Sequence, residues 1–537
     1  MIRENLGYRL KEIMDQKEFS FTALSKKSGI SRDHLYNIVN GTKEVGVDTI
    51  EKITTALGIL PKTLFDFKNI DCETKIDHEI LNDFSSLPNN FWDFSDSKTD
   101  DLIHNLHNYP AVMIYPISRA IFGIVSKYKR IDTVMDPFVG SGTVIVEAQL
   151  KGFKHVIGND LNPLALLITK AKTTLLSEKS FEDINRLIDV IKELEKLYIP
   201  QIKEFERYVL SNYKITEKGE WSLKADEITN QYFSNTSLNE FKAPKIDNLG
   251  FWFRPESIIE LSILKQVIDK IATENDKAFL YCSLSETIRS CSNTRTSEFK
   301  LYRKPINKIL SKENNALEKF VDVLNKNLEK EYEYSKVVKK NSEIKIINDN
   351  AQNLFEVKDG SVDLVLTSPP YGDSHTTVAY GQFSRLSNFW LELSEDKNLD
   401  SKLLGGKKNK NQTIESLGSK TLIEKIKEIS KLDNHRALEV LDFYFDLDKS
   451  LEEITKKCKK FGYQFWVVGN RTVKKVNIPT DVILEELGEK YNLKVLAKFY
   501  RRISNKVMPS VNSPSNKAGD VVQTMCNEII VFFKKIK

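Results

Sequence analysis

The sequence contains a short polar segment, Thr367-Ser368-Pro369-Pro370-Tyr371, directly after the apolar run 361–366. Such a run predicts a buried strand, and open α/β sheets bind ligands at the carboxyl ends of their strands. The two prolines make a stiff turn with free carbonyl groups, Ser368 adds a hydroxyl acceptor and Tyr371 a flat ring. This set fits a planar heterocycle whose amino hydrogens bond Ser368 and the Pro369 carbonyl. An ordinary Pro-Pro turn explains it equally well, so a second motif must decide.

The second motif is Asp136-Pro137-Phe138-Val139-Gly140-Ser141-Gly142-Thr143, which lies between the apolar run 131–135 and the helically spaced run 144–150. This order predicts a strand, a glycine loop and a helix. Glycines let the backbone approach a ligand closely, and a helix N-terminus offers unpaired N–H groups to a polar one. The motif lacks the lysine of a Walker A loop and a full GxGxxG, which argues against a phosphate or dinucleotide site.

A carboxylate follows at the end of the next predicted strand, 155–160. This residue, Asp160, lies 24 positions after Asp136. An acidic residue about 20 positions beyond a glycine loop binds ribose hydroxyls in folds of this kind. The sequence therefore predicts that the ligand of the loop carries a ribose.

Together the two motifs resemble the exocyclic-amino DNA methyltransferases that use S-adenosylmethionine. Ser368 is similar to the first residue of the cytosine-N4 subgroup, whereas adenine-N6 relatives more often carry Asp or Asn there. The segment 107–111 and the tail 501–528 also resemble that family, so that the resemblance covers roughly residues 90–175 and 340–537. It implies an α/β fold with a Rossmann-like methyltransferase sheet, and it leaves the middle of the chain unexplained, where the pattern of the residues predicts a largely helical insert.

The resemblance also implies the roles of the site residues. S-adenosylmethionine would be bound by Asp136, Pro137, Phe138, Gly140, Gly142, Thr143 and Asp160. A base flipped out of double-stranded DNA would meet the catalytic residues Ser368, Pro369, Pro370 and Tyr371, with Asp349 near the base pocket. Transfer would be direct, without a metal ion. The implied partner is a restriction endonuclease that acts on the same DNA site without necessarily binding the enzyme.

Composition limits the class of protein. The 537 residues are 40% hydrophobic and 29% charged, which is ordinary for a soluble protein. The sequence has no apolar run long enough for a membrane helix, and its first residues are charged where a signal peptide would become apolar. We therefore predict a cytoplasmic protein without membrane contact. Its five cysteines are scattered, which argues against metal sites and disulfides. None follows a proline, which argues against the thiolate mechanism of cytosine-C5 enzymes.

Residues 1–67 form a predicted unit of their own. Periodic apolar residues indicate helices near 6–13, 21–28, 31–40 and 47–57, with Ser31 as an N-cap and with Gly29 and Gly41 ending the second and third helices. The short turn between the second and third helices resembles the helix-turn-helix of repressors and predicts an all-α DNA-binding domain. The contacts to DNA would come from Arg32, Tyr36 and Asn37. A docking module is the alternative, since ten Lys and Arg face nine Asp and Glu in this region.

The rest of the chain divides by pattern. Residues 68–101 are acidic and polar and predict a linker, or a strap across the next domain. Residues 102–174 and 341–537 would be the two parts of the methyltransferase domain. Between them, 175–340 is too long for a strand–helix connection and predicts an insert, helical except for 215–248, as a candidate target-recognition region.

Three further segments and one histidine remain less specific. Residues 495–537 carry eight Lys and Arg against two Asp and Glu, which favours contact with nucleic acid. Cations also gather at 289–304, where solvated helix faces explain them equally well, and at 405–411, where a solvated loop is the default interpretation. His375 is more typical of a loop hydrogen bond than of a catalyst.

Three functions stay open at this point. The first is a DNA amino methyltransferase of a restriction-modification system, specific for cytosine N4 or for adenine N6, whose helix-turn-helix regulates transcription or aids target binding. The second is an RNA amino methyltransferase, which the N-terminal domain disfavours. The third is a regulator whose methyltransferase domain has decayed, which the intact glycine loop, Asp160 and Ser368–Tyr371 disfavour.

Overall fold

The computed structural model describes residues 2–40, 43–65, 72–95, 101–216, 219–295, 299–311, 314–373, 377–394, 398–408, 413–503, 511–512, 522–523 and 527–537. The chain divides into two compact units. The first contains residues 1–91 and 120–130, and the second contains 92–119 and 131–537. Helix α7 (Tyr115–Tyr128) contributes residues to both.

The first unit is a bundle of short helices. They are α1 (Ile2–Gln16), α2 (Phe21–Ser28), α3 (Arg32–Val39), α4 (Val47–Leu57) and α5 (Pro61–Leu64). Ser20 and Ser31 cap α2 and α3, and Gly29 ends α2 in the left-handed conformation. The four predicted helices are thus confirmed, although α5 was not predicted and Gly41 lies outside the described residues.

A further helix, α6 (Cys72–Ser85), corrects the prediction of a linker over 68–101. Its apolar residues Ile80 and Phe84 are buried, and the Tyr8 hydroxyl of α1 donates a hydrogen bond to Glu79. The helix was missed because only these few apolar positions, among many acidic ones, carry its periodicity.

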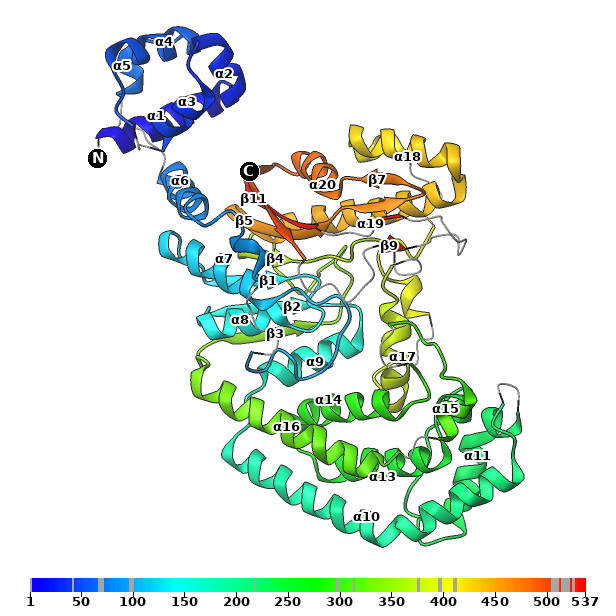
Figure 1. The fold of residues 1–537 in the computed structure, drawn as a ribbon. Coiled ribbons are helices and arrows are strands. Elements are labelled where there is room, and N and C mark those ends of the chain that lie inside the picture. Colours follow the sequence, from blue (N-terminus) through cyan, green and yellow to red (C-terminus); the bar gives the residue numbers. More distant parts are fainter. Residues whose placement is uncertain are drawn as a thin grey trace. The chain divides into compact units, whose positions relative to one another are not determined.

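The second unit is built on a mixed sheet of seven strands in the order β3-β2-β1-β4-β5-β11-β8. The strands are β1 (Thr133–Asp136), β2 (His155–Asn159), β3 (Glu343–Ile347), β4 (Val362–Thr367), β5 (Cys458–Gly469), β8 (Leu493–Arg502) and β11 (Asn527–Lys535). Neighbours from β3 to β5 run parallel, while β11 is antiparallel to both β5 and β8. The chain lays β2 and β3 on one side of β1 and then returns to add β4 and β5 on the other (Figure 1).

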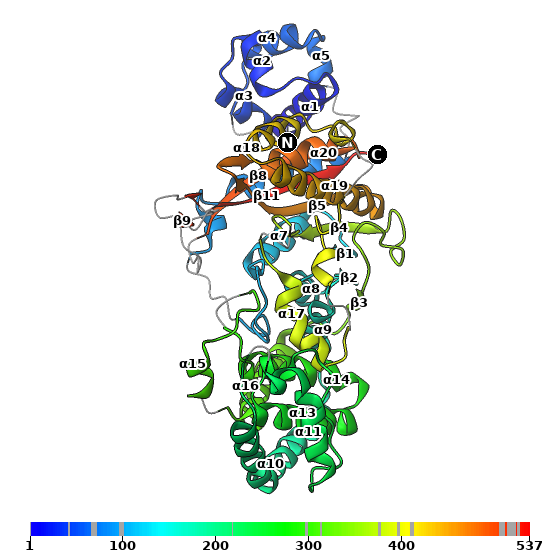
Figure 2. The ribbon, with the colours of Figure 1, turned by 90° about the vertical axis from the view of Figure 1, so that its right-hand side faces the viewer.

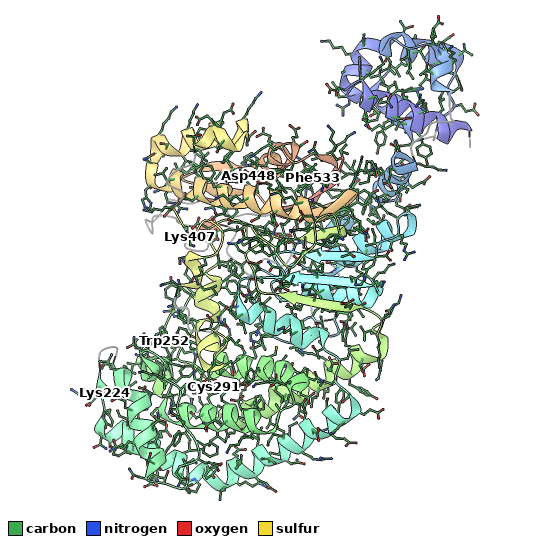
Figure 3. All side chains as sticks on the ribbon, turned by 180° about the vertical axis from the view of Figure 1, so that it is seen from behind. Lys224, Trp252, Cys291, Lys407, Asp448 and Phe533 are labelled. Atoms are coloured by element: carbon green, nitrogen blue, oxygen red, sulfur yellow. The ribbon has the colours of Figure 1, made fainter. Side chains whose placement is uncertain are left out.

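Helices pack against this sheet. Helices α18 (Lys420–Leu432), α19 (Asn434–Lys457) and α20 (Thr480–Glu489) share a buried core with Met135, Val365 and Phe533 from the strands. Figure 2 shows these helices beside β5, β8 and β11, and Figure 3 labels Phe533 there. Helix α8 (Thr143–Lys151) follows β1, and α9 (Pro163–Thr173) follows β2. Strand residues alternate between faces, so the adjacent buried residues Val134 and Met135 face opposite sides of the sheet, and Met135 belongs to the core shared with α18, α19 and α20.

The insert is helical, as predicted. It contains α10 (Glu178–Asn212), α11 (Glu220–Ser234), α12 (Leu249–Trp252), α13 (Pro255–Ile271), α14 (Glu274–Cys291), α15 (Ile306–Leu310) and α16 (Ala316–Val337). The expectation that 215–248 lacks helix was wrong, because α11 lies there and buries Trp221 and Phe233. Figure 1 shows α9, then α14, then α13 and α16, then α10 as successive layers.

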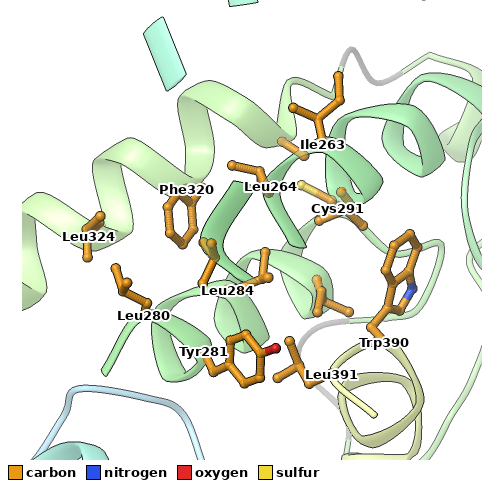
Figure 4. Close-up of a cluster of buried hydrophobic side chains, with 14 of the residues drawn as sticks. Ile263, Leu264, Leu280, Tyr281, Leu284, Cys291, Phe320, Leu324, Trp390 and Leu391 are labelled. Carbon is orange, nitrogen blue, oxygen red and sulfur yellow. The ribbon is translucent and has the colours of Figure 1, made fainter. Parts of the chain in front are cut away.

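These layers share one core with the sheet part of the unit. Residues of α9 (Leu164, Leu167), of α14 (Leu280, Leu284) and of α16 (Phe320) belong to a single buried cluster. Figure 4 shows the centre of this cluster, where Trp390 and Leu391 also meet α14. The insert is therefore packed onto α9 rather than tethered to it.

The remaining described elements are short: α17 (Tyr380–Trp390), the 3-10 turns Phe91–Asp93, Leu399–Ser401 and Ile414–Leu417, and the strand pairs β6 (Arg471–Val473) with β7 (Val476–Ile478) and β9 (Val511–Asn512) with β10 (Val522–Gln523).

Candidate active site

The two chemical motifs meet because their strands are neighbours. Strands β1 and β4 pair in parallel, so that Asp136 and Thr367 end them at the same edge of the sheet. The Thr367 hydroxyl donates a hydrogen bond of 2.7 Å to the Asp136 carboxylate. This is the point at which the strand order reverses, and open α/β sheets bind ligands there. Segments more than 200 residues apart in the sequence thus form one site.

The glycine loop depends on two glycines with positive φ. Gly140 has φ +49° and Gly142 has φ +83°, a region that side chains disfavour. A Cβ atom on Gly142 would lie 2.9 Å from Oγ1 of Thr169 in α9. Gly142 also forms the N-cap of α8, so the loop leads directly into the N-terminus of that helix.

Asp160 fixes the loop and faces the same space. One carboxylate oxygen accepts from the Gly140 N–H at 3.0 Å, and the other accepts from the Asn162 N–H at 2.9 Å. Burial raises the pKa of Asp160 above its usual range. Asp160 therefore shapes the loop in addition to lining the pocket beside it, where a hydroxyl group could bind it.

A pocket lies where these segments converge, and its empty space of about 870 Å³ includes its opening to solvent. Of the predicted site residues it is lined by Asp136, Pro137, Phe138, Gly140, Thr143, Asp160, Ser368 and Pro370. Gly142, Pro369 and Tyr371 do not line it. Asp349, which we expected near the base pocket, also lines it, although its carboxylate accepts from the N–H groups of Asn350 and Phe355.

The Ser368–Tyr371 turn is held by a chain of polar contacts. The Ser368 hydroxyl donates to the Tyr371 hydroxyl at 3.2 Å, and Tyr371 donates to Glu528 of β11 at 2.9 Å. The other oxygen of Glu528 pairs with Arg501 of β8. Burial raises the pKa of Tyr371 well above its usual range, with the Glu528 charge adding to the effect, so this hydroxyl keeps its proton. Tyr371 is thus anchored through its hydroxyl.

Electrostatics single out Asp136. Its side chain is 3% exposed, and burial raises its pKa to about 7. The hydrogen bonds from Thr367 and from the Phe138 N–H oppose this effect, and both reach the same carboxylate oxygen, Oδ1. The pocket thus contains a carboxylate whose charge changes near neutral pH.

Several residues of the site were not predicted. Tyr109 and Tyr380 line the pocket, and the Asn162 amide donates to the hydroxyls of Tyr109 and Ser384. Lys172 of α9 is fully buried and donates to the carbonyls of Ser141 and His104 at 2.8 and 2.7 Å. Tyr109 lies in the segment 107–111, which the family resemblance had pointed to, whereas the sequence contains no signal that marks the other residues named here.

The pocket contains groups that suit S-adenosylmethionine. Its Ser141 hydroxyl is buried and has no hydrogen-bond partner among the described residues, which is typical of a group that binds a ligand. A Cβ on Gly140 would lie 3.5 Å from the Tyr109 ring, so glycine keeps this wall open. Carboxylates at Asp136 and Asp160 suit a cationic ligand with ribose hydroxyls, and Phe138, Val139 and Leu161 suit an adenine ring. The residues fit the cofactor.

Helix α3 carries the predicted DNA-contacting residues. Arg32 and Tyr36 are exposed and Asn37 is half-buried. The Tyr36 ring lies near Phe21, and its hydroxyl is 3.2 Å from the Ser85 hydroxyl of α6. Arg32, Tyr36 and Asn37 thus lie on one short helix, with Tyr36 partly engaged by α6.

The cationic segments look different in the structure. In the tail, Arg501 pairs with Glu528, and Lys535 donates to the carbonyls of Thr455 and Cys458. These cations hold the sheet together, which the count of charges could not show. His375 and residues 409–411 lie outside the described residues.

The described residues also bear on metal binding and on membrane crossing. They contain no group of three or more His, Cys, Asp or Glu side chains placed to bind a metal ion. In the same residues, no helix combines the length and the apolar character needed to cross a membrane.

The glycine loop, the paired carboxylates and the Ser-Pro-Pro-Tyr turn at one sheet edge define a transferase-type α/β site, preceded in the chain by a helix-turn-helix unit. A family model described as D12 class N6 adenine-specific DNA methyltransferase matches residues 115–399, and the chain belongs to this family of DNA methyltransferases. A Cro/C1-type HTH DNA-binding domain model matches residues 9–69. The description of the first model names adenine N6, where the sequence had led us to expect cytosine N4.

Individual relatives agree with both assignments. The Type II methyltransferase M.MvaI of Kocuria varians is 40% identical over 469 residues, which cover 83% of this chain and 94% of the relative. M.MjaII of Methanocaldococcus jannaschii is 22% identical over 330 residues, which cover 52% of this chain and 61% of that relative. The control protein C.BamHI of Bacillus amyloliquefaciens is 37% identical over 76 residues, 14% of this chain and 94% of its own. The chain therefore joins a Type II restriction-modification methyltransferase to a control-protein-like DNA-binding domain.

Proposed function

We propose that this protein transfers a methyl group from S-adenosylmethionine to the exocyclic N4 of cytosine at a specific site in duplex DNA. The observation that carries the proposal is the pocket, in which Ser368 and Pro370 lie together with Gly140 and Asp160. A base-binding turn and a nucleoside-binding loop thus open into one space. We also propose a Rossmann-like methyltransferase fold, supported by the strand order and its reversal at β1 and β4.

The residues that would bind the cofactor are those of the glycine loop, with Asp160 at its ribose. When bound, S-adenosylmethionine supplies a methyl group activated by a positively charged sulfur. The carboxylates of Asp136 and Asp160 favour that positive charge in a buried setting, where charges interact more strongly than in water. Thr169 and Lys172 donate to the carbonyls of Gly140 and Ser141 and keep the backbone of the loop in place. The Asn162 N–H donates to the Asp160 carboxylate and holds that side chain.

The chain's own residues prepare the amino group. The target base must leave the helix to reach the pocket, at a cost of a few kcal/mol. The Ser368 oxygen accepts one of its amino hydrogens, which draws the nitrogen toward tetrahedral geometry and frees its lone pair. Catalysis then rests on positioning and on electrostatics, since no covalent intermediate is required.

Cytosine is proposed because Ser368 stands where adenine enzymes more often carry Asp or Asn. Adenine N6 is the second candidate, favoured by the description of the family model. Both bases present similar amino hydrogens. Plasmid DNA from cells that express the protein would be digested to nucleosides and analysed by mass spectrometry, with DNA from cells that lack it as control. N4-methylcytosine supports the proposal, and N6-methyladenine would replace it with the second candidate.

We further propose that the helix-turn-helix unit binds a separate DNA site and regulates transcription, and that a restriction endonuclease acts at the methylated site. Similarity to a control protein along almost its whole length supports a regulatory role for the first unit. Arg32 and Asn37 on α3 would contact bases in the major groove. Gel shifts with DNA from upstream of the gene test this, and the Arg32→Ala variant should lose the shifted band.

A further inference from the structure

We propose that Glu528 and Arg501 orient the hydrogen bonds of the Ser368–Tyr371 turn, so that the Ser368 oxygen can only accept from a base in the pocket. The site would thereby select a base with an exocyclic amino group over one with a carbonyl group. Glu528 is then a positioning residue that acts through Tyr371. The inference rests on the proposed function, because it concerns how the same pocket chooses its substrate.

The direction of the chain follows from its last member. A carboxylate in an ion pair has no hydrogen to donate, so the Tyr371 hydroxyl must donate to Glu528, at 2.9 Å. The single hydrogen of Tyr371 is then used, and its oxygen can only accept from Ser368, at 3.2 Å. Each hydroxyl in the row therefore points away from the pocket.

Arg501 keeps the carboxylate in this role. Arg501 and Glu528 are cross-strand neighbours in β8 and β11, and their side chains form an ion pair that is largely buried. The Arg501 Nε donates to the carbonyl of Trp92 at 3.1 Å, and the Trp92 ring stacks on Phe499 with centroids 5.1 Å apart. Arginine is always charged and only donates, so the Glu528 oxygen that faces it remains an acceptor.

The consequence appears at Ser368, which lines the pocket. Its hydrogen is directed to Tyr371, and among the described residues its hydroxyl has no other hydrogen-bond partner. The remaining lone pairs of Ser368 suit an amino hydrogen. A carbonyl oxygen at the same position, as in uracil or hypoxanthine, would face another acceptor, and sites built to bind one polar group reject analogues that lack it.

A purely structural role is the alternative, in which Glu528 only ties β8 to β11. That role explains the bond to Arg501. It does not require the second oxygen of Glu528 to bind Tyr371, and it predicts that the isosteric change Glu528→Gln lowers stability without altering the choice of base. The two explanations therefore differ in their consequences for Tyr371.

The first experiment compares three variants. In Glu528→Gln the amide oxygen turns to Arg501, so the amide N–H group faces Tyr371 and reverses the chain, and the Ser368 hydroxyl then points its hydrogen at the amino group. In Tyr371→Phe the chain is cut and Ser368 rotates freely. The double variant cuts the reversed chain. Glu343→Gln on β3, whose exposed carboxylate bonds His155, is the matched control.

The measurement is the single-turnover rate of methyl transfer to unmethylated plasmid DNA at saturating cofactor and DNA. We expect Glu528→Gln to be slower than wild type by about 5- to 150-fold, the range for a buried polar group facing the wrong partner. The rate of Tyr371→Phe should fall by a smaller factor, and the double variant should transfer the methyl group faster than Glu528→Gln alone. Cofactor affinity and the rate of Glu343→Gln should stay at the wild-type level. A double variant no faster than Glu528→Gln would overturn the proposal.

A second measurement uses only Tyr371→Phe, in case Glu528→Gln does not fold. Binding is compared for two duplexes that differ at the methylated base, one with the amino base and one with its carbonyl analogue. The preference is the affinity for the amino duplex divided by the affinity for the carbonyl duplex, and it should be larger for the wild type than for Tyr371→Phe. The free-energy cost of unpairing each base cancels when the two proteins are compared, because both bind the same two duplexes. An equal preference in both proteins overturns the proposal. If the product proves to be N6-methyladenine, the proposal of cytosine as the target base is wrong. The inference about Glu528 is then still tested by comparing a duplex that contains adenine with one that contains hypoxanthine at the methylated position.

Discussion

The glycine loop offers the sharpest test of how the fold makes the pocket, through the substitution Gly142→Ala. The residue has φ +83°, and the left-handed conformation costs a residue with a side chain about 1–2 kcal/mol. The new Cβ would also lie 2.9 Å from Oγ1 and 3.2 Å from Cα of Thr169. Overpacking of this kind typically costs a further ~1–3 kcal/mol. We therefore expect a total loss of about 2–5 kcal/mol in the free energy of unfolding.

Gly360→Ala is the matched control. Gly360 has φ +61°, but no atom lies within 4 Å of its added Cβ, so only the conformational cost of about 1–2 kcal/mol applies. Thermal unfolding is followed for the transition whose midpoint temperature rises when S-adenosylmethionine is added, because a ligand stabilises the part of the protein that binds it. Cofactor affinity is measured by titration calorimetry. Gly142→Ala should bind about tenfold more weakly or worse, and Gly360→Ala should bind like wild type.

A second substitution locates the strain. Thr169→Ala removes two of the three atoms nearest to the added Cβ, although it also removes the bond from Thr169 to the Gly140 carbonyl. The double variant should therefore be more stable than the sum of the single losses predicts, as is usual for residues in contact. The reasoning is refuted if Gly142→Ala behaves like Gly360→Ala, or if the two losses simply add.

Other predictions concern the remaining parts of the site. Because burial raises the pKa of Asp136 to about 7 in the folded state, its negative charge lowers the free energy of unfolding above that pH and has no effect below pH 4. Asp136→Asn keeps both hydrogen bonds to Oδ1 and removes this charge. The free energy of unfolding should therefore rise by up to ~4 kcal/mol at pH 8 and stay unchanged at pH 4. Pro370→Ala should abolish methyl transfer while calorimetry shows cofactor affinity within a few-fold of wild type, because the turn would touch the base. Asn37→Ala should weaken binding to the separate operator in gel shifts and leave methylation unchanged. The double variant Arg32→Ala with Asn37→Ala, which leaves α1 in place against α6, should likewise preserve the methylated sequence, read by sequencing modified DNA. Relaxed specificity would assign the helix-turn-helix to target recognition.

The strands and the glycine loop were readable from the sequence because their signals are local. The short, mostly apolar runs 131–135 and 361–366 favour buried strands by their length and their β-branched residues, and they end at the polar residues Asp136 and Thr367. The same holds for α2 and α3, whose capping serines lie next to the residues they cap. Periodicity and capping act over a few residues, so one sequence reveals them.

The contacts that complete the site could not be predicted in this way. Glu528 reaches Tyr371 from 157 residues away, and Lys172 lies on a helix whose other lysine, Lys170, is exposed. Nothing in the sequence separates these two lysines, since the buried one is distinguished only by the carbonyls of Ser141 and His104 that it meets. Burial lowers the pKa of Lys172 to about 8, an effect created wholly by the tertiary fold.

The insert supports the walls of the pocket, although none of its described residues is among those that line it. Helix α14 contributes Ser285, whose hydroxyl bonds His107 at 2.8 Å, and Glu286, which accepts from the Asn108 amide at 2.9 Å. His107 and Asn108 directly precede Tyr109 and Pro110, which line the pocket. Ser285 also donates to Ser387 of α17, the helix that presents Tyr380 to the pocket. One helix of the insert thus holds two walls of the pocket, so a change in the insert reaches the cofactor and base sites through hydrogen bonds rather than through a flexible connection.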